Sequence, residues 1–446
     1  MMQFKKYDRY KDSGVEWLGE IPEGWQLLSN KYVFNLKKNQ VGKKSSDYVL
    51  LSLTLKGVIQ RVLEDGGKFP AEFDTYQEVK IGDFIFCLFD VEETPRCVGL
   101  SDYDGMITGA YTVMEVNPNF DKRYLYYFFL NLDSDKRLRP LYTGLRNTIS
   151  KDNFFSFKTF IPPLPEQTAI ANFLDDKTAK IDQAITQKEK LIALLKERKQ
   201  ILIQNAVTGK WSMVNGQWSM TPKEKLKDSG VEWIGEIPVG WEVKRLKNFV
   251  FIQSGLTLGK SYGKKKLVSI PYLRVANVQD GYFSLNQISE VEIPEVEIPR
   301  YLLKLGDILV TEGGDIDKLG RGTIWNSEID PCIHQNHIFS VRLISPGIST
   351  KFISIVFGAD YGRKYFTHTA NKTTNLASTN STKLGNFPIA LPPLLTQHAI
   401  VAHIETQSTK IDQAITLQQT QIEKLKEYKA TLIDSAVTGK IKVSEL

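Results

Sequence analysis

Hydrophobic residues recur at a helical spacing in two long stretches of the chain, with polar residues between them. In the first stretch the apolar positions follow one another at intervals of four, seven, three and seven: Ile181, Ile185, Ile192, Leu195 and Leu202. The second stretch has the same intervals: Ile411, Ile415, Ile422, Leu425 and Leu432. A spacing that averages about 3.5 residues places these side chains in one narrow seam along a helix. Each stretch therefore predicts a long amphipathic helix with one surface to bury.

The two stretches are copies of each other, spanning residues 161–210 and 391–440. The segments KIDQAIT (Lys180–Thr186 and Lys410–Thr416) and AVTGK (Ala206–Lys210 and Ala436–Lys440) are identical in both. About 42 residues of helix make a rod of roughly 60 Å. Because a rod with a single apolar seam is not stable alone in water, we expect the two rods to pack on each other as a coiled coil. The alternative is an ordinary core helix, which is typically much shorter.

Residues at the ends of both stretches favour helix boundaries there. Pro165 and Glu166 suit a first helical turn, and Thr396 is a candidate N-cap of the second helix. Gly209 and Gly439 lie where a left-handed C-terminal cap is expected.

A second repeat precedes each variable part of the chain. Lys11–Trp25 has the sequence KDSGVEWLGEIPEGW, and Lys227–Trp241 has KDSGVEWIGEIPVGW. The chain is thus two tandem copies of a leader, a variable region and a long helix. For the leader we favour a structural clasp, in which Trp17 and Trp25 pack and Pro22–Gly24 turns, over any chemistry. Trp211–Pro222, WSMVNGQWSMTP, is predicted to be a linker.

The variable regions, residues 26–160 and 242–390, have little sequence in common but a similar order of features. Short runs of Val, Ile, Leu, Tyr and Phe alternate with Gly, Asp and Asn, which predicts mixed strands with a few helices. Ile81–Phe86 matches Leu305–Val310, in each case a Gly-Asp turn before a buried strand. Tyr111–Val116 likewise resembles Ile338–Leu343. The predicted fold class is α+β, with two tandem mixed α/β domains and two long helices.

Composition adds few constraints. The 446 residues are 42% hydrophobic and 24% charged, as in soluble globular proteins, and the net charge of +6 is too small to imply nucleic-acid binding by itself.

The cysteines, Cys87, Cys97 and Cys332, form no close pair. The N-terminal residues have no apolar core typical of a signal peptide, and the longest aromatic run, Tyr124–Leu130, is far shorter than the ~20 residues of a membrane span. We therefore expect a cytoplasmic protein.

Three short motifs raise the question of catalysis or ligand binding. Gly255–Ser261, GLTLGKS, has one residue too few between its glycines for a phosphate-binding loop. Cys332, His334 and His337 lack a regularly spaced fourth ligand for a metal. Asp315 and Asp317 are better explained by a Gly-rich turn than by a nuclease site, and no methyltransferase motif or nucleophile elbow is present. We expect no catalytic residue, no metal and no cofactor bound by this chain.

Basic and polar loops in both variable regions are the candidate DNA-binding elements. Lys and Arg neutralise phosphates, and Arg, Asn and Gln can form paired hydrogen bonds with guanine or adenine edges. On residue chemistry alone, the candidates are Lys43, Lys44, Arg139, Arg146, Asn147, Lys151, Lys260, Lys264, Lys265, Arg274, Asn277, Arg321, His334, Gln335, Asn336, Lys372 and Asn380.

The order of these repeats resembles the specificity (S) subunits of type I restriction-modification enzymes. The resemblance rests on GVEWLGEIPEGW and GVEWIGEIPVGW, the PLP and LPPL helix entries, and the duplicated KIDQAIT and AVTGK, and it covers essentially the whole chain. It implies two target-recognition domains separated by two antiparallel helices, arranged with pseudo-two-fold symmetry. The implied boundaries are residues 1–160 and 227–390 for the recognition domains, 161–210 and 391–446 for the helices with the C-terminal tail, and 211–226 for the linker.

The resemblance also implies a function and partners. Each recognition domain would read one half of a split, asymmetric target in double-stranded DNA, and the helices would fix the gap between the halves. Two modification subunits would supply S-adenosylmethionine-dependent adenine methylation, and restriction subunits would supply DNA translocation and cleavage with ATP and Mg. Two alternatives remain open from the residues alone: a scaffold whose variable domains bind proteins, and a self-contained nuclease or methyltransferase.

Overall fold

The computed structural model describes residues 4–14, 19–61, 72–214, 216–314, 319–320, 322–372 and 377–443. The chain divides into two compact units. Unit 1 contains residues 1–188 and 419–446, and unit 2 contains residues 189–418. Each unit therefore combines one variable region with part of both long helices.

The strands of unit 1 are short and mostly antiparallel. They are β1 (Tyr10–Asp12), β2 (Glu20–Pro22), β3 (Gln26–Ser29), β4 (Phe34–Leu36), β5 (Leu51–Thr54), β6 (Gly57–Gln60), β7 (Gln77–Val79), β8 (Phe84–Phe86), β9 (Val98–Leu100), β10 (Gly105–Ile107), β11 (Thr112–Val116), β12 (Tyr142–Thr143), β13 (Thr148–Ile149) and β14 (Lys158–Ile161). Its α-helices besides the long pair are α1 (Asn30–Val33), α2 (Lys122–Ser134) and α3 (Lys151–Ser156), with 3-10 helices η1 (Gly42–Asp47) and η3 (Arg139–Leu141).

Unit 2 has the same kinds of elements. Its strands are β15 (Trp211–Val214), β16 (Gln217–Met220), β17 (Leu226–Asp228), β18 (Glu236–Pro238), β19 (Glu242–Arg245), β20 (Val250–Ser254), β21 (Leu267–Leu273), β22 (Ser289–Pro294), β23 (Ile308–Thr311), β24 (Gly313–Gly314), β25 (Gly322–Ile324), β26 (Ile333–His334), β27 (Ile338–Leu343), β28 (Asn371–Lys372), β29 (Ala377–Ser378) and β30 (Pro388–Leu391). Its helices are α5 (Ile298–Tyr301), α6 (Thr350–Gly358), α7 (Asp360–Thr369) and α8 (Ser381–Gly385), with 3-10 helices η4 (Lys223–Lys225), η5 (Leu246–Asn248), η6 (Val275–Asn277) and η7 (Glu295–Glu297).

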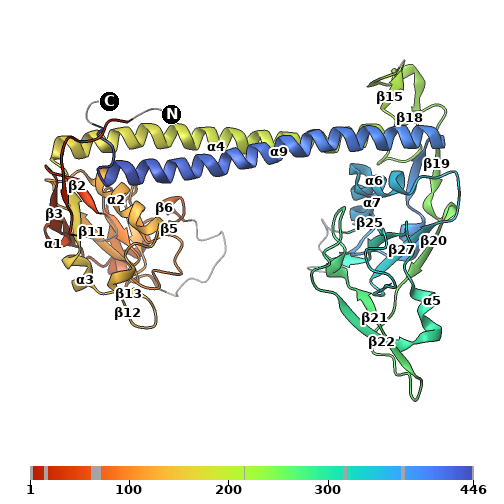
Figure 1. Ribbon diagram of the computed structural model, residues 1–446, viewed down its shortest axis with the longest axis horizontal. Coiled ribbons are helices and arrows are strands. Elements are labelled where there is room, and N and C mark those ends of the chain that lie inside the picture. The colour runs from red at the N-terminus through yellow and green to blue at the C-terminus, as the bar shows by residue number, and fades with distance from the viewer. Residues whose placement is uncertain are drawn as a thin grey trace. The chain divides into compact units, whose positions relative to one another are not determined.

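A four-stranded antiparallel sheet with one connectivity forms the centre of both units. Its strand order is β4-β11-β8-β9 in unit 1 and β20-β27-β23-β25 in unit 2. β8 and β23 are the buried strands predicted after the two Gly-Asp turns, and β11 and β27 correspond to the second pair of matching segments. A helix packs on each sheet, α2 against β9 and α6 against β25 (Figure 1). The two variable regions thus share a fold, as the order of their features predicted.

The Gly-Asp turns are built from equivalent contacts. Gly82 and Gly306 have φ angles of 87° and 88°, which favour glycine because it lacks a Cβ. The aspartate that follows is buried in each case and accepts a hydrogen bond from a backbone N–H three residues earlier, at 2.7 Å for Asp83 and 2.9 Å for Asp307. Each carboxylate also pairs with a cation, Lys37 in unit 1 and Arg342 in unit 2.

The first and last strands of each variable region pair with each other. β3 pairs with β14 and β19 pairs with β30, both antiparallel over four residues. Each variable region therefore begins and ends on neighbouring strands. The last of these strands leads directly into the Pro-Pro segment before a long helix.

The long helices are α4 (Leu164–Val207) and α9 (Leu394–Val437), each 44 residues long. Within each unit, parts of the two helices lie side by side and run in opposite directions (Figure 1). In unit 1, Lys429 binds Asp182 at 2.6 Å and Lys188 bonds to Gln421, so residue numbers rise along α4 as they fall along α9. In unit 2, Lys199 binds Asp412 at 2.7 Å. These two ion pairs occupy equivalent positions of the repeats.

The predicted seam is buried for most of its length. Ile181, Ile411, Ile415, Ile422 and Leu432 are each less than one-tenth exposed. The other seam residues, Ile185, Ile192, Leu195, Leu202 and Leu425, are partly buried. In unit 1, Ile181 and Ile185 share a hydrophobic cluster with Leu425 and Leu432, which is the helix packing that the periodicity predicted.

The leaders clasp the C-terminal ends of the helices. Gly209 and Gly439, with φ angles of 72° and 74°, end the helices in the expected left-handed conformation. A Cβ on Gly209 would lie 2.5 Å from Pro238, and one on Gly439 would lie 2.4 Å from Pro22. The two repeated motifs, AVTGK and the leader, therefore depend on each other: the proline of the leader requires the glycine of the helix end.

One expected helix cap is wrong. Thr396 does not cap α9, because that helix begins two residues earlier, at Leu394. The segment predicted as a linker contains an ordered hairpin of β15 and β16. In the leader of unit 1, Trp25 is 1% exposed and its backbone N–H donates to the Pro22 carbonyl, which confirms the packing and the turn predicted there. Trp17 lies outside the described residues.

Candidate nucleic-acid interface

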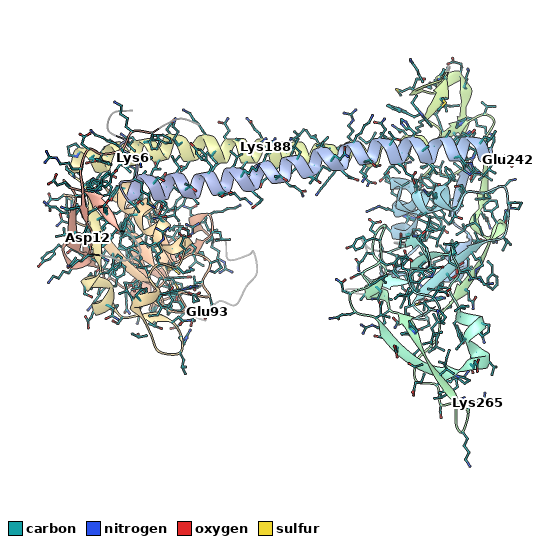
Figure 2. The ribbon with its side chains drawn as sticks, viewed as in Figure 1. Lys6, Asp12, Glu93, Lys188, Glu242 and Lys265 are labelled. Atoms are coloured by element: carbon teal, nitrogen blue, oxygen red, sulfur yellow. The ribbon has the colours of Figure 1, made fainter. Side chains whose placement is uncertain are left out.

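Exposed lysines without a carboxylate partner among the described residues form the basic part of the candidate surface. Lys43 and Lys44 lie in η1 of unit 1, and Lys151 begins α3. In unit 2, Lys264 and Lys265 lie in the loop before β21, and Figure 2 shows Lys265 beyond the open end of the β21–β22 pair, where Leu267 lies opposite Pro294. This hairpin pairs six residues of each strand, so an ordered ribbon holds its lysines away from the central sheet. Lys266 continues the same exposed run.

Three other predicted cations are already paired with acids. Arg139 forms two hydrogen bonds with Glu92, and Arg146 forms two with Asp90. The guanidinium groups, acting mainly through these hydrogen bonds, lower the pKa of both carboxyls below the ordinary values. Lys260 lies 3.3 Å from Glu297. A phosphate would have to compete with a carboxylate at each of these positions, so they are weaker candidates than the unpaired lysines.

The loop from Asp90 to Glu93 was not among the predicted site residues. It supplies the partners of Arg139 and Arg146, and Glu93 accepts a hydrogen bond from Asn147 at 3.1 Å. These acids precede their partners by about fifty residues in the sequence, so no local spacing signalled the pairing.

Two of the predicted base-contacting residues are buried and are corrected here. Asn277 is 4% exposed, and its amide donates to the carbonyls of Ser284 and Gln287 while its oxygen accepts from the Arg274 N–H. His334 is 1% exposed, with Nδ1 3.0 Å from the Ile338 carbonyl. Burial lowers the pKa of His334 to about 4, so this imidazole is neutral at pH 7. Both side chains stabilise loops of unit 2 and do not reach the surface.

The remaining polar candidates vary in accessibility. The oxygen of Gln335 accepts from the Val275 N–H, and Asn380 caps α8 by accepting from the Lys383 N–H at 2.8 Å. Asn336 is half-buried, while Arg274 and Lys372 are exposed. Arg321 lies outside the described residues. The candidate surface is therefore composed mainly of lysines, and the expected set of base-reading amides is reduced.

The cysteine and histidine motif gives no sign of a reactive or metal-binding centre. Cys87, Cys97 and Cys332 are buried as free thiols. Burial raises the pKa of both Cys97 and Cys332 to about 12, so neither is a thiolate at neutral pH. His337 is exposed and lies 2.7 Å from Glu312. Within the described part of the chain, no three His, Cys, Asp or Glu side chains are grouped to hold a metal ion.

The segment GLTLGKS is an irregular loop. Leu256 bridges to Gln335, and a Cβ on Gly255 would lie 2.0 Å from the His334 carbonyl oxygen. Gly255 is therefore explained by this close approach of two backbones. Among the described helices, none is long and apolar enough to cross a membrane.

Comparison with known proteins adds a family relationship. The family model "Type I restriction modification DNA specificity domain" matches residues 98–193 and 238–427, one region in each half of the chain. The MjaVIII specificity subunit of Methanocaldococcus jannaschii is 25% identical over 458 aligned residues, which cover 100% of this chain and 99% of the relative. The StySPI specificity subunit of Salmonella potsdam is 24% identical over 87% of this chain and 82% of the relative. The EcoKI specificity subunit of Escherichia coli is 27% identical over 58% of this chain and 52% of the relative.

Solved structures agree at the level of the fold. A chain from a study of the assembly and conformational transition of a type I restriction-modification system superposes with a TM-score of 0.64 at 16% identity, covering 94% of this chain and 98% of that chain. The HsdS subunit from Thermoanaerobacter tengcongensis superposes with a TM-score of 0.50, also at 16% identity and with the same coverage.

Proposed function

Because the chain belongs to the family of type I restriction-modification DNA specificity domains, we propose that it selects the DNA sequence on which such a system acts. The observation that carries this proposal is a duplicated structural framework, made of the central sheet, the Gly-Asp turn and the clasp. It supports a different surface in each unit. The central sheets, Gly-Asp turns and clasps are equivalent in the two units, whereas the exposed basic loops differ in sequence and position. Two different readers on equivalent frames would recognise two different half-sites, so the target is split and asymmetric.

The variable regions act as the two target-recognition domains in this proposal. The unpaired lysines of each region neutralise backbone phosphates and hold the domain in register on the duplex. In unit 1 these are Lys43, Lys44 and Lys151, and in unit 2 they are Lys264, Lys265 and Lys372. Arg274 and the partly accessible Asn336 and Gln335 remain candidates for contacts with base edges.

The helix pair sets the number of unread base pairs between the half-sites. Both helices are uninterrupted over 44 residues, which corresponds to about 66 Å of α-helix. A helix of constant length provides a constant spacing, as the separation of half-sites does in dimeric DNA-binding proteins.

Partner subunits perform the chemistry. Two modification subunits would bind the equivalent frames and methylate adenine with S-adenosylmethionine, and restriction subunits would use ATP and Mg to translocate and cleave DNA. The duplicated frame supports this stoichiometry, because each leader and helix end offers one partner the same backbone. No residue of this chain is assigned a catalytic role, and the cytoplasm is the proposed location.

The first experiment is single-molecule sequencing of adenine methylation in a host that carries this chain with its modification subunits. A split, asymmetric motif with a constant gap is the expected result. Methylation of one contiguous or palindromic motif would contradict the two-reader arrangement. A lack of methylation, with modification subunits that are active beside another specificity subunit, would favour a protein-binding scaffold instead.

Exchange of one variable region separates the two readers. Replacing residues 26–160 with the corresponding region of a relative should change one half-site and leave the other half-site and the gap unchanged. The pairing of β3 with β14 keeps both junctions at one place in the frame. The reciprocal exchange of residues 242–390, between β19 and β30, is the matched control and should change only the other half-site.

The lysine assignment has its own test. Replacing Lys264 and Lys265 by Ala should reduce the slope of log affinity against log salt by about 2, since each phosphate contact contributes roughly 0.9. Lys244→Ala removes an exposed charge that is paired with Glu242 and should leave the slope unchanged. An unaltered slope in the double variant would remove the β21–β22 hairpin from the DNA interface without affecting the two-reader proposal.

A further inference from the structure

One glutamine near the start of each long helix is buried. Gln167 of α4 is 1% exposed and Gln397 of α9 is 0% exposed. The two occupy equivalent positions of the repeat, in the first turn of each helix. A polar side chain that is shielded from water has to satisfy its hydrogen-bonding groups within the protein. The partners of these two amides therefore show which segments they hold together.

In unit 1 the amide of Gln167 joins the variable region to the entry of the long helix. Its oxygen accepts a hydrogen bond from the Asp121 N–H at 2.9 Å, and its nitrogen donates to the Pro162 carbonyl at 2.8 Å. Asp121 is the N-cap of α2, and Pro162 directly follows β14. The amide thus fixes the start of α2 to the place where β14 leads into α4.

In unit 2 the amide of Gln397 makes the same connection. Its oxygen accepts from the Ser349 N–H at 2.8 Å, and its nitrogen donates to the carbonyls of Pro392 at 2.9 Å and Gly347 at 3.3 Å. Ser349 is the N-cap of α6, and Pro392 directly follows β30. Both variable regions present a backbone N–H to the amide, and so they dock in the same register although they have little sequence in common.

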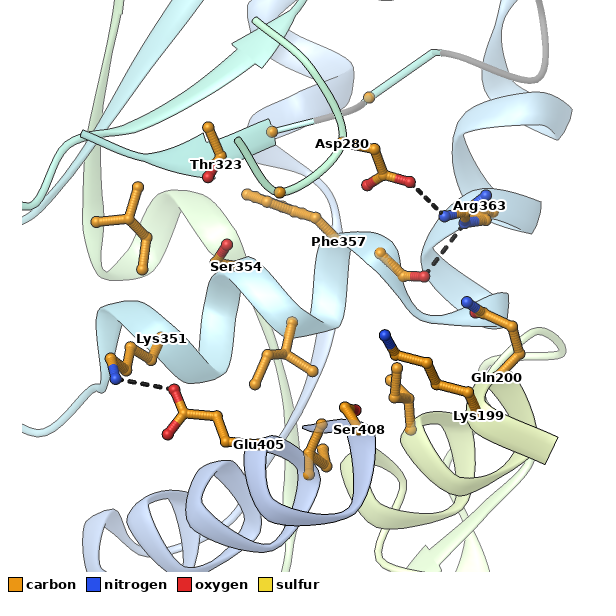
Figure 3. A pocket seen from close by; sticks show the side chains of 18 of the residues that line it. Lys199, Gln200, Asp280, Thr323, Lys351, Ser354, Phe357, Arg363, Glu405 and Ser408 are labelled. Carbon is orange, nitrogen blue, oxygen red and sulfur yellow. Dashed lines mark hydrogen bonds and ion pairs between the residues drawn. The ribbon is translucent and has the colours of Figure 1, made fainter. Parts of the chain in front are cut away.

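The contacts beside these amides define the position of the variable region less sharply. Arg123 of α2 lies 2.7 Å from Asp175 of α4, and Lys351 of α6 lies 2.8 Å from Glu405 of α9 (Figure 3), but all four side chains are exposed. A cavity of about 510 Å³ also lies between α6, α7 and the long helices of unit 2 (Figure 3). Exposed ion pairs are weak and apolar contacts are non-directional, whereas a buried hydrogen bond has a fixed distance and direction.

A second point of attachment lies on the other long helix in each unit. In unit 1, Asp434 of α9 accepts a hydrogen bond from Arg137, which follows α2, at 2.6 Å. In unit 2, Gln204 of α4 accepts from the Tyr361 N–H at the start of α7, at 3.0 Å. Each variable region is therefore held at two points on different helices. Two such points fix both its position along the helices and its orientation about them.

This attachment bears on the gap between the half-sites. A gap that is longer or shorter by one base pair moves a half-site by about 3.4 Å along the duplex and turns it by about 35°. A side-chain hydrogen bond is lost when its two atoms are more than about 3.5 Å apart. A domain that is held at two points cannot follow such a movement, whereas a domain that is released at one of them can pivot about the other.

We propose that Gln167 and Gln397 are positioning residues that restrict the two recognition domains to a single gap length. Both side chains are buried, so they cannot contact bases themselves. They act by holding α2 and α6 on the long helices while exposed loops read the half-sites. This inference rests on the proposed function, because it assigns residues to the selection of the gap. Without the amides, the domains read the same half-sites across a wider set of gaps.

The test measures adenine methylation by the full chain with its modification subunits. The substrates are duplexes that carry the half-sites of the unaltered chain, with its own gap or with a gap one base pair shorter or longer. Gln397→Met keeps the length of the side chain and removes its hydrogen bonds. The methylation rate at the altered gaps, relative to the original gap, should rise about tenfold, as expected from the loss of buried hydrogen bonds. The half-sites should stay the same.

Two further variants make the test specific. Gln167→Met should have the same effect through unit 1, and the double variant should have a larger one. Lys351→Ala removes the neighbouring exposed ion pair and should leave the ratio of rates unchanged. An equal rise in Lys351→Ala would overturn the proposal, because any weakening of the contact would then suffice. The ratio separates positioning from stability, since a destabilised chain loses methylation at every gap in the same proportion.

An unchanged ratio in either folded glutamine variant overturns the proposal. If Gln397→Met does not fold, Gln167→Met decides the question. If neither folds, the amides are required for folding itself, which overturns their assignment to the gap. Failure of the proposed function is recognised separately, because the unaltered chain would then show no split motif with a constant gap before any variant is made.

Discussion

In unit 1 a charged residue of α9 binds the variable region through an ion pair and a hydrogen bond. In unit 2 the equivalent residue of α4 is neutral and makes a hydrogen bond. Asp434 of α9 accepts hydrogen bonds from Arg137 at 2.6 Å and from Asn131 at 3.1 Å. The equivalent residue of α4 is Gln204, whose oxygen accepts from the Tyr361 N–H at 3.0 Å. The backbone frame is therefore the same in both units, and each variable region has evolved its own side-chain contacts to it.

Two kinds of contact that do not involve the variable regions are alike. Lys199–Asp412 and Lys429–Asp182 are copies of one ion pair, and the same glycine–proline contact forms each clasp. The comparison teaches that this ion pair and the clasp are duplicated unchanged, whereas the contacts of Asp434 and Gln204 with the variable regions differ.

The largest loss of stability, and the largest difference between the units, should follow substitution of the buried aspartates in the Gly-Asp turns. Asp307→Ala should destabilise unit 2 by about 3–5 kcal/mol, because it leaves Arg342, Ser340 and the Lys304 N–H without their acceptor. The equivalent Asp83→Ala should cost unit 1 less, since within the described part of the chain its carboxylate accepts only from Lys37 and the Lys80 N–H. Hydrogen exchange at β23 and β8 measures each unit separately. Equal losses would show that the number of partners does not set the cost.

Acid should weaken unit 2 through His334, which has no counterpart in unit 1 because all five histidines lie in unit 2. The pKa is about 4 in the folded chain, against an ordinary value of 6.5. Below pH 6.5 the unfolded chain therefore takes up a proton that the folded chain refuses, so stability falls until pH 4 and then levels. The expected loss over this window is about 3 kcal/mol.

Hydrogen exchange in β26 and β27, measured at several pH values, reports the stability of unit 2 at the strands around His334 and so measures that loss. His334→Gln is the control, and its stability should depend less steeply on pH between 6.5 and 4. The same slope in both proteins would mean that other groups account for the acid sensitivity.

The contacts of Asp434 with the variable region of unit 1 should contribute more stability than the contact of Gln204 with the variable region of unit 2. Asp434→Ala should destabilise unit 1 by about 2 kcal/mol, because Arg137 and Asn131 lose a partly buried acceptor. Gln204→Ala should cost unit 2 about 1 kcal/mol, the value of one neutral hydrogen bond. Hydrogen exchange in α2 and α7 reports the two effects. A larger loss for Gln204→Ala would reverse the comparison.

The smallest effects should be equal in the two units. Lys199→Ala and Lys429→Ala each remove an ion pair whose aspartate is about half exposed, so each should cost less than ~1 kcal/mol. Thermal unfolding of the two single variants and the double variant tests this equality and the additivity of the losses. A clear inequality would show that the helix pair is not equivalent in the two units.

The sequence by itself determined the helices, the duplication and the order of elements. Helix periodicity is local, so the seam from Ile181 to Leu202 and the glycine caps could be predicted without knowledge of the fold. The Gly-Asp turns were also predictable, because their geometry depends on two adjacent residues. Repeated segments then implied two equivalent frames.

Only the tertiary structure decided which polar side chains remain available at the surface. His334 and Asn277 have the residue types of base-contacting groups, but long-range packing buries them, and Arg146 is paired with an aspartate 56 residues away. Periodicity and spacing do not encode such contacts, because they depend on which distant segments the folded chain brings together.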